Sequence, residues 1–232
     1  MIMFIATFVR SALGFGDGLI AMPLLTMLIG VEMATPLVAL GGSTIAATIL
    51  LRSWQGVDLK AAWRLIASTL VGIPLGLLFL RMAPDAIVEV GLGIVLIGFG
   101  GYSLSTPQLP RLEREWLSYL FGAVAGVLGI AYNTNGPPVV IYGMLRRWSP
   151  EQFRATLQGY FLPTGLVILL SHGLAGLWTP PVLRLYGYGL PVIMAGVFTG
   201  GLANQRVSGE RFKQGVYGFL VLMGALLILR AL

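Results

Sequence analysis

Long apolar stretches fill this chain, and short polar or glycine-rich interruptions divide them into eight segments. Two segments are themselves broken: residues 2–29 at 14–18, and residues 116–145 at the stretch YNTNGPP. The unbroken segments cover residues 33–51, 65–80, 86–104, 155–171, 186–203 and 214–232. Their lengths approach the roughly 20 apolar residues that a helix needs to cross a bilayer, and the alternating pattern of a membrane barrel is absent from the sequence. The pattern therefore predicts an all-α, polytopic membrane protein.

Composition supports a membrane protein. Only 10% of the residues are charged, and the mean hydropathy is +0.86, whereas about a quarter of a soluble domain is charged. Basic loops that face the cytoplasm explain the net charge of +6 better than a nucleic-acid partner does. The sequence has no cysteine and one histidine, His172, so thiolate chemistry is excluded and a histidine metal site is not expected. We expect no metal, no cofactor and no nucleic-acid partner.

The chain divides into two similar halves, each with four segments, around the polar stretch STPQLPRLERE. We expect a first transmembrane repeat, a polar linker and a second transmembrane repeat, at residues 1–104, 105–115 and 116–232. A shift of 115 places Gly14 on Gly129, and a shift of 124 places Gly72 on Gly196. Paired interruptions at corresponding places of two halves are the sequence pattern that points to a transport site between repeats.

Basic residues indicate how the broken segments sit in the membrane. If all eight segments cross, seven basic residues fall on each side. If each broken segment is a re-entrant hairpin, eleven basic residues fall on one side, in loops 52–64, 111–114, 146–154 and 206–213, and Arg81, Arg184 and Arg230 fall on the other. Because cytoplasmic loops are rich in Lys and Arg, we favour inverted repeats with six crossings, two hairpins and both termini outside. Eight crossings with kinked first and fifth segments is the alternative.

The broken segments resemble motifs of a known family. GFGDGLIAMPLL, which begins at Gly14, resembles the glycine-rich GFGGG…P motif of the TauE/SafE family of sulfite-exporter-like membrane proteins. GVLGIAYNTNGPPVVIYGML resembles the second-repeat motif of that family, and SPEQFRATLQGYF and LPVIMAGVFTGG are also similar to it. The resemblance implies a multi-pass transporter of a small sulfur-containing anion, such as sulfite, thiosulfate or a sulfonate, in a prokaryotic-type plasma (inner) membrane. Two departures leave the substrate open: Asp17 replaces the middle glycine, and YNTN is more polar than the family pattern.

The two breaks are the candidate anion site. Hairpin tips carry backbone groups without partners, so they have to face protein or a water-filled cavity. Half-helices that start near Gly18 and near Pro137 would point free N–H groups and positive dipole ends at this cavity. We therefore expect substrate binding at mid-membrane by both breaks and by two polar side chains inside spans. These residues are Gly14, Phe15, Gly16, Asp17, Gly18, Asn133, Thr134, Asn135, Gly136, Pro137, Ser43 and Gln158.

Asp17 allows three interpretations, because a carboxylate in an anion pocket repels the ligand unless it is protonated or paired. It is a proton-coupling group, an ion-pair partner of Arg10 on the same broken segment, or a cap of the helix that begins at Gly18. Asp17 and Arg10 are therefore the coupling candidates.

Several other features have a purely structural alternative. Glycines also let membrane helices pack closely, and Ser43, Thr44 and Gln158 can hydrogen-bond neighbouring helices instead of lining a cavity. His172 at the end of a span is expected at the membrane interface rather than in a proton relay. Arg154, one turn before Gln158, is a weaker candidate for contact with the anion.

The sequence favours a secondary transporter or exporter of a small anion. It contains no P-loop for ATP hydrolysis, and an enzyme is not expected, because no metal cluster or nucleophile–base pair is present. A passive anion channel and a transporter of a small organic carboxylate are the alternatives. The expected partners are the small anionic substrate and the lipid bilayer, and a homo-oligomer is left open.

Overall fold

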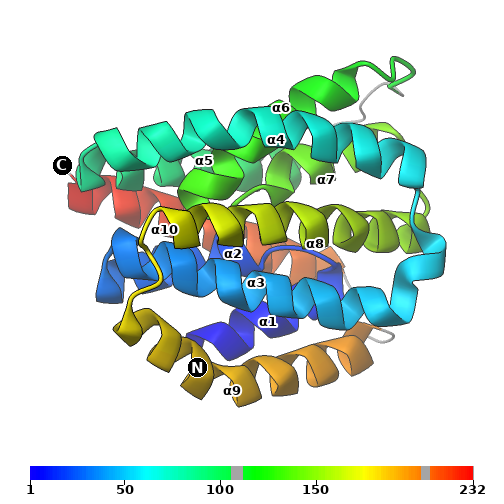
Figure 1. The fold of residues 1–232 in the computed structure, drawn as a ribbon. Helices are drawn as coiled ribbons and strands as arrows, with labels where there is room; N and C mark the ends of the chain where they lie inside the picture. The colour runs from blue at the N-terminus through cyan, green and yellow to red at the C-terminus, as the bar shows by residue number, and fades with distance from the viewer. Residues whose placement is uncertain (106–111, 205–209, 232) are drawn as a thin grey trace.

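The computed structural model describes residues 1–105, 112–204 and 210–231, and these residues are helical apart from short connections. Figure 1 shows a bundle in which most helices run roughly parallel or antiparallel to one long direction. The helices are α1 (Ile2–Leu13), α2 (Asp17–Ile29), α3 (Val31–Ser53), η1 (Trp54–Gly56), α4 (Leu59–Met82), α5 (Asp85–Ser105), α6 (Leu117–Tyr132), α7 (Gly136–Leu145), α8 (Pro150–Leu174), α9 (Pro180–Asn204) and α10 (Glu210–Ala231).

Six helices of the described chain are long and apolar enough to cross a membrane: α3, α4, α5, α8, α9 and α10. The predicted all-α, polytopic membrane fold is confirmed. Helix α4 begins at Leu59, ahead of the apolar segment predicted from residue 65, because Lys60 and Arg64 continue the helix beyond the apolar part. Hydropathy marks the part of a helix that suits lipid, not the residue at which its hydrogen bonds begin.

The four shorter apolar helices form the two broken segments, α1 with α2 and α6 with α7. Helices α2 and α7 are the inner members, since most of their residues are buried, as expected for helices that are apolar all round. Helix α1 packs on α9, α6 packs on α4, and α3 packs on α8. The spans thus enclose the two breaks.

The second broken segment enters and leaves the bundle at the same end. The amide of Leu112, which precedes α6, donates to the carbonyl of Leu145 at the end of α7, at 2.9 Å. Arg146 donates to the carbonyl of Leu112 at 3.0 Å. Beside them Arg64 forms a hydrogen-bonded ion pair with Glu115. This hydrogen bond from Arg64 holds the pKa of Glu115 below its usual range. The chain therefore reverses direction between α6 and α7.

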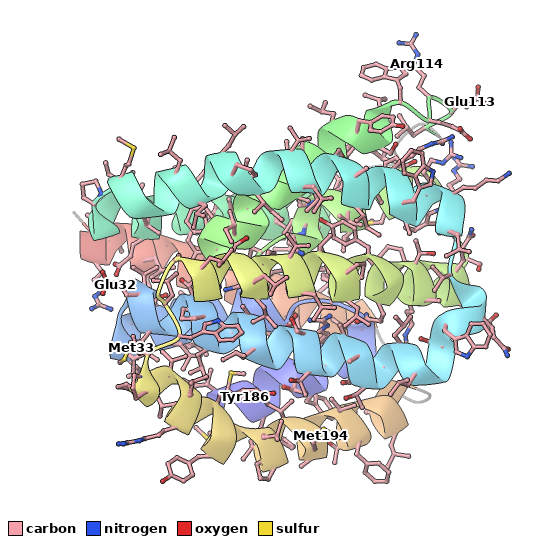
Figure 2. All side chains as sticks on the ribbon, viewed as in Figure 1. Glu32, Met33, Glu113, Arg114, Tyr186 and Met194 are labelled. Carbon is pink, nitrogen blue, oxygen red and sulfur yellow. The ribbon has the colours of Figure 1, made fainter. Side chains whose placement is uncertain are left out.

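The first broken segment also reverses direction, and its two ends lie at the opposite end of the bundle (Figure 1). Helix α1 runs alongside α9, because Thr7 lies beside Gly196 and Ser11 beside Gly200. Helix α2 then returns to the start of α3, where Glu32 lies at the other end of the bundle from Arg114 (Figure 2). We call the end that holds Lys60, Arg64, Arg114 and Arg146 the basic end. Arg111 and Arg206, two of the basic residues assigned to this side, lie outside the described residues.

Left-handed backbone conformations end the first helix of each broken segment. Gly14 has φ +92° and Gly16 has φ +107°, and Asn133 has φ +50° at the end of α6. Residues with a Cβ rarely adopt such angles, and asparagine tolerates them better than most. The glycines of the first break are therefore required by the turn itself.

Candidate functional site

The two breaks lie against each other in the interior of the bundle. A Cβ at position 18 would run into the backbone carbonyl of Asn133, so the start of α2 and the tip between α6 and α7 are in backbone contact. This close contact explains why position 18 is a glycine. It brings together two stretches of the predicted site that lie more than one hundred residues apart in the chain.

Gly18→Ala is expected to lower the free energy of unfolding by about 1–3 kcal/mol, because the added methyl group overpacks a contact that involves backbone. Thermal unfolding of the detergent-purified variant measures the loss. Gly98→Ala is the matched control, because a Cβ at position 98 meets no atom within 4 Å; it should match the wild type or exceed it slightly. Equal stability of the two variants would contradict the contact.

Arg10 is the centre of the site. It is 4% exposed, and its guanidinium donates from one terminal nitrogen to Asp17 Oδ2 at 2.8 Å and from the other to Gln158 Oε1 at 3.0 Å. The amide of Gln158 donates in turn to the carbonyl of Gly14 at 2.7 Å. The guanidinium carbon lies 4.7 Å from the ring centroid of Phe161, which is a cation–π distance. These contacts tie the first break to α8.

Of the three interpretations of Asp17, the ion pair with Arg10 is observed. The capping interpretation is wrong, because α2 begins at Asp17 itself, its N-cap is Gly16, and no side-chain capping bond forms there. The carboxylate points to the guanidinium instead, since pairing a buried charge with an opposite one outweighs a bond to a neutral amide. Asp17 still lies in the first turn of α2, where a negative charge suits the helix dipole.

Two small adjoining cavities lie at the contact of the breaks. The larger has a volume of about 40 Å³, and its walls include Arg10, Asp17, Ser43, Asn133 and Asn135. The smaller, of about 10 Å³, lies beside Gly16, Gly18, Thr134 and Gly136. A water needs roughly 10–15 Å³, so this space holds a few waters or a small oxyanion rather than a large organic molecule.

Several buried polar atoms at these cavities have no hydrogen-bond partner within the described chain: Arg10 Nε, Ser43 Oγ and Thr134 Oγ1. The first hydrogen bond of α2 runs from Ile20 to Gly16, so the amides of Asp17, Gly18 and Leu19 precede the helical ladder. Unpaired buried donors cost free energy unless a ligand or water binds them. The site therefore presents donors to a small acceptor-rich ligand.

Some predicted site residues do not reach the cavities. Phe15 packs edge-on against Phe99 and Phe153, at centroid distances of 6.0 and 6.5 Å, so it anchors the break in the apolar core. Pro137 is buried in the first turn of α7, where its missing N–H costs nothing. Gln158 reaches Arg10 and Gly14 rather than the cavity, and Thr44 bonds Tyr186 on α9 at 2.7 Å.

His172, at the end of a span, is packed inside the protein. It is fully buried in the last turn of α8, with Nε2 at 3.3 Å from the carbonyl of Ile130. Carbonyls in the last turn of a helix lack intrahelical partners, and Ile130 is in the last turn of α6, which accounts for the contact. Arg154 does not line the cavities; it donates to the carbonyl of Ser11 at 3.2 Å.

The predicted site did not include Phe161, Gly42 and Gly165. Phe161 lies one turn after Gln158 on the same face of α8, and this spacing is a signal that was available. Gly42 and Gly165 line the larger cavity from α3 and α8, and a Cβ at position 42 would crowd the Asp17 carboxylate. Nothing local in the sequence distinguishes these two glycines from those that only serve packing.

The turn residues of the two breaks are spaced differently from the glycine-rich letters that a shift of 115 aligns. Gly14 and Asn133 end α1 and α6 in the same left-handed conformation, and they are 119 residues apart (133 minus 14). Asp17 and Gly136, which begin α2 and α7, share this spacing. The sequence shift of 115 aligned the glycine-rich letters instead, because asparagine takes the turn position that glycine takes in the first break.

Comparisons with known proteins agree with this architecture. The chain matches the family described as "Sulfite exporter TauE/SafE" over residues 1–227. It is 24% identical to the "Probable sulfite/organosulfonate exporter TauE" of Cupriavidus necator, over 97% of this chain and 91% of that protein. It is 34% identical to a "Probable membrane transporter protein" of Haemophilus influenzae, over 58% of this chain and 54% of that protein. No solved structure matches the chain. The chain therefore belongs to the TauE/SafE family of membrane transport proteins.

Proposed function

We propose that this protein is a secondary transporter of a small sulfur-containing oxyanion, bound where the two helix breaks meet. The observation that carries the proposal is Arg10, a buried guanidinium that lines the cavity between the breaks. Ionisable groups within membrane segments are costly and mark transport sites by default. The experiment below distinguishes this proposal from a passive anion channel and from a carboxylate transporter.

Arg10 supplies the positive charge for the anion in this proposal. Arginine has five N–H donors in a planar fork that suits oxyanions, and the pairs with Asp17 and Gln158 use only part of them. Ser43 Oγ, Asn133 and Asn135 add neutral groups from α3 and the second break. Neutral donors bind an anion and still let it leave, as a transporter requires.

Asp17 couples the anion to a proton in this proposal. While Asp17 is ionised it occupies Arg10, so the anion has to compete with a carboxylate for the same donors. A proton on Asp17 removes the competing charge and frees Arg10. Binding of the anion and binding of the proton therefore favour each other, and the linkage is reciprocal.

We further propose that the chain consists of two inverted repeats, which alternate access to this site. Matching packing contacts support it: Gly72 and Gly76 on α4 lie against Ala123 and Val127, as Gly196 and Gly200 on α9 lie against Phe4 and Phe8. The glycines of α9 lie 124 residues after those of α4. Their contact partners on α6 lie 119 residues after those on α1. Opposite directions of the two hairpins agree with the charge bias that favours the basic end as the cytoplasmic side.

The proposed sulfur-containing substrate is supported by one relative, which is described as a probable exporter of sulfite and organosulfonates. The small cavity suits such an anion. The test is flux into proteoliposomes of purified protein, with sulfite, methanesulfonate, thiosulfate, sulfate and acetate offered in turn, with and without a pH gradient. We expect saturable flux of a sulfur oxyanion that a pH gradient drives uphill. Unsaturable flux would indicate a channel, and preference for acetate a carboxylate transporter.

A further inference from the structure

A hollow of about 490 Å³ opens at the basic end, between the end of α3 and the start of α8. Ile49, Ser53 and Gln55 lie on one wall, and Glu151 and Arg154 lie on the other. It is far larger than the cavity at Arg10, which holds about 40 Å³. The hollow is large enough to admit a hydrated anion from the solvent.

Arg154 lies between this hollow and the first break. Its side chain is in contact with Gly14, and one terminal nitrogen donates to the carbonyl of Ser11 at 3.2 Å. Within the described ranges Arg154 forms no ion pair, although the Glu151 carboxylate lines the same hollow. One terminal nitrogen is used by Ser11, so other donors of the fork remain free for a ligand.

Arg154 and Arg10 are separated by one narrow layer. Gly14 hydrogen-bonds back to the carbonyl of Arg10 at 2.6 Å, and its own carbonyl accepts from Gln158, one turn after Arg154 on α8. The bond between Gln158 and Gly14 thus lies between the guanidinium at the hollow and the guanidinium at the cavity. Two arginines thus lie in series, one at the hollow and one at the cavity, with the carboxylates of Glu151 and Asp17 beside them.

The opposite end of the bundle is closed at the matching positions. A shift of 119 residues takes Ile49 to Ile168, Ser53 to His172 and Arg154 to Thr35, and these three counterparts are 3%, 0% and 1% exposed. There the Asn133 side chain donates to the carbonyl of Thr35, and His172 contacts the carbonyl of Ile130. The positions that line the hollow at the basic end therefore have buried, packed counterparts at the opposite end.

We propose that the hollow is an access site for the anionic substrate on the basic side, with Arg154 as its anion-binding residue. The structure is then the state open to the basic side, closed at the other side by Thr35 and His172. This inference rests on the proposed function. It adds a second binding position, ahead of Arg10, at which the anion is desolvated and selected by charge before it reaches the buried site.

The test is sulfite flux from the basic side in oriented vesicles, with Arg154→Gln compared with Arg114→Gln. Arg114 carries the same charge at the same end, but it projects from the linker away from the bundle (Figure 2). We expect Arg154→Gln to raise KM about 10-fold, the loss of one charge-assisted contact, with the maximal rate within about twofold. Arg114→Gln should leave both values unchanged. An unchanged KM in Arg154→Gln, with normal wild-type flux, overturns the access site and leaves the proposed function intact, whereas no anion flux in the wild type overturns both.

Labelling gives a second readout that does not depend on transport rates. The chain has no native cysteine, so Ser53→Cys places one thiol in the hollow and Glu113→Cys places one on the exposed linker. We expect methanesulfonate to slow the reaction of an anionic maleimide with Ser53→Cys and not with Glu113→Cys. The protection should disappear in Ser53→Cys/Arg154→Gln. Equal protection with and without Arg154 would overturn its role.

Discussion

Arg10→Gln is expected to weaken substrate binding strongly and to destabilise the protein. Hydrogen bonds to a charged group are worth roughly 1.5–3 kcal/mol, so the anion affinity should fall by about 100-fold. The substitution also leaves the Asp17 carboxylate, which is 15% exposed, without its partner, which costs up to about 3–5 kcal/mol. Thermal unfolding with increasing sulfite measures both effects: a lower melting temperature, and no rise with the anion.

The double variant Arg10→Gln/Asp17→Asn separates the two effects of the Arg10 substitution. With both charges removed no buried carboxylate is left unpaired, so most of the lost stability should return. Anion binding should not return, because the guanidinium is still absent. If the stable double variant binds sulfite with the wild-type affinity, Arg10 is not the anion ligand.

Asp17→Asn is expected to give the opposite change in affinity. Arg10 then has no competing carboxylate, so sulfite should bind about 10-fold more tightly than to the wild type at the same pH. The ligand-free variant should be less stable than the wild type by up to about 3–5 kcal/mol, and sulfite should raise its melting temperature more.

Transport by Asp17→Asn should be uncoupled from protons. Exchange of labelled for unlabelled sulfite across the vesicle membrane should continue, while a pH gradient should no longer drive accumulation. The control is Asp58→Asn, which removes a carboxylate outside the breaks, near Gln152, and should keep the pH response. Full accumulation with an unchanged pH profile in Asp17→Asn would remove the coupling role.

The positions of the helices could be predicted because lipid leaves the backbone few choices. Apolar runs of membrane length have to be helical, and the glycine clusters had to interrupt them, so the breaks at 14–18 and in YNTNGPP were readable from the sequence. Exact helix ends were not, as α4 shows by extending through Lys60 and Arg64. Charged residues near the membrane surface can continue a helix that hydropathy no longer marks.

The candidate site could be predicted in part. The residues of the breaks stand out by type, and Arg10 with Asp17 was a recognisable pair because both lie on one broken segment. The bond from Gln158 to Gly14 joins residues 144 positions apart, and the cation–π contact of Phe161 depends on the same docking of α8. Such contacts depend on how helices pack, and no local pattern encodes them.

The sequence by itself determined that this chain is a helical membrane protein with two broken segments and charged residues inside one of them, because each property depends on local composition. Tertiary structure alone decided that the two breaks touch through Gly18 and Asn133, that Asp17 pairs with Arg10 rather than capping α2, and that His172 is buried against α6. The physical reason is that a buried charge or an unpaired carbonyl takes whichever partner the packing brings within reach. That partner is set by the arrangement of the helices in space.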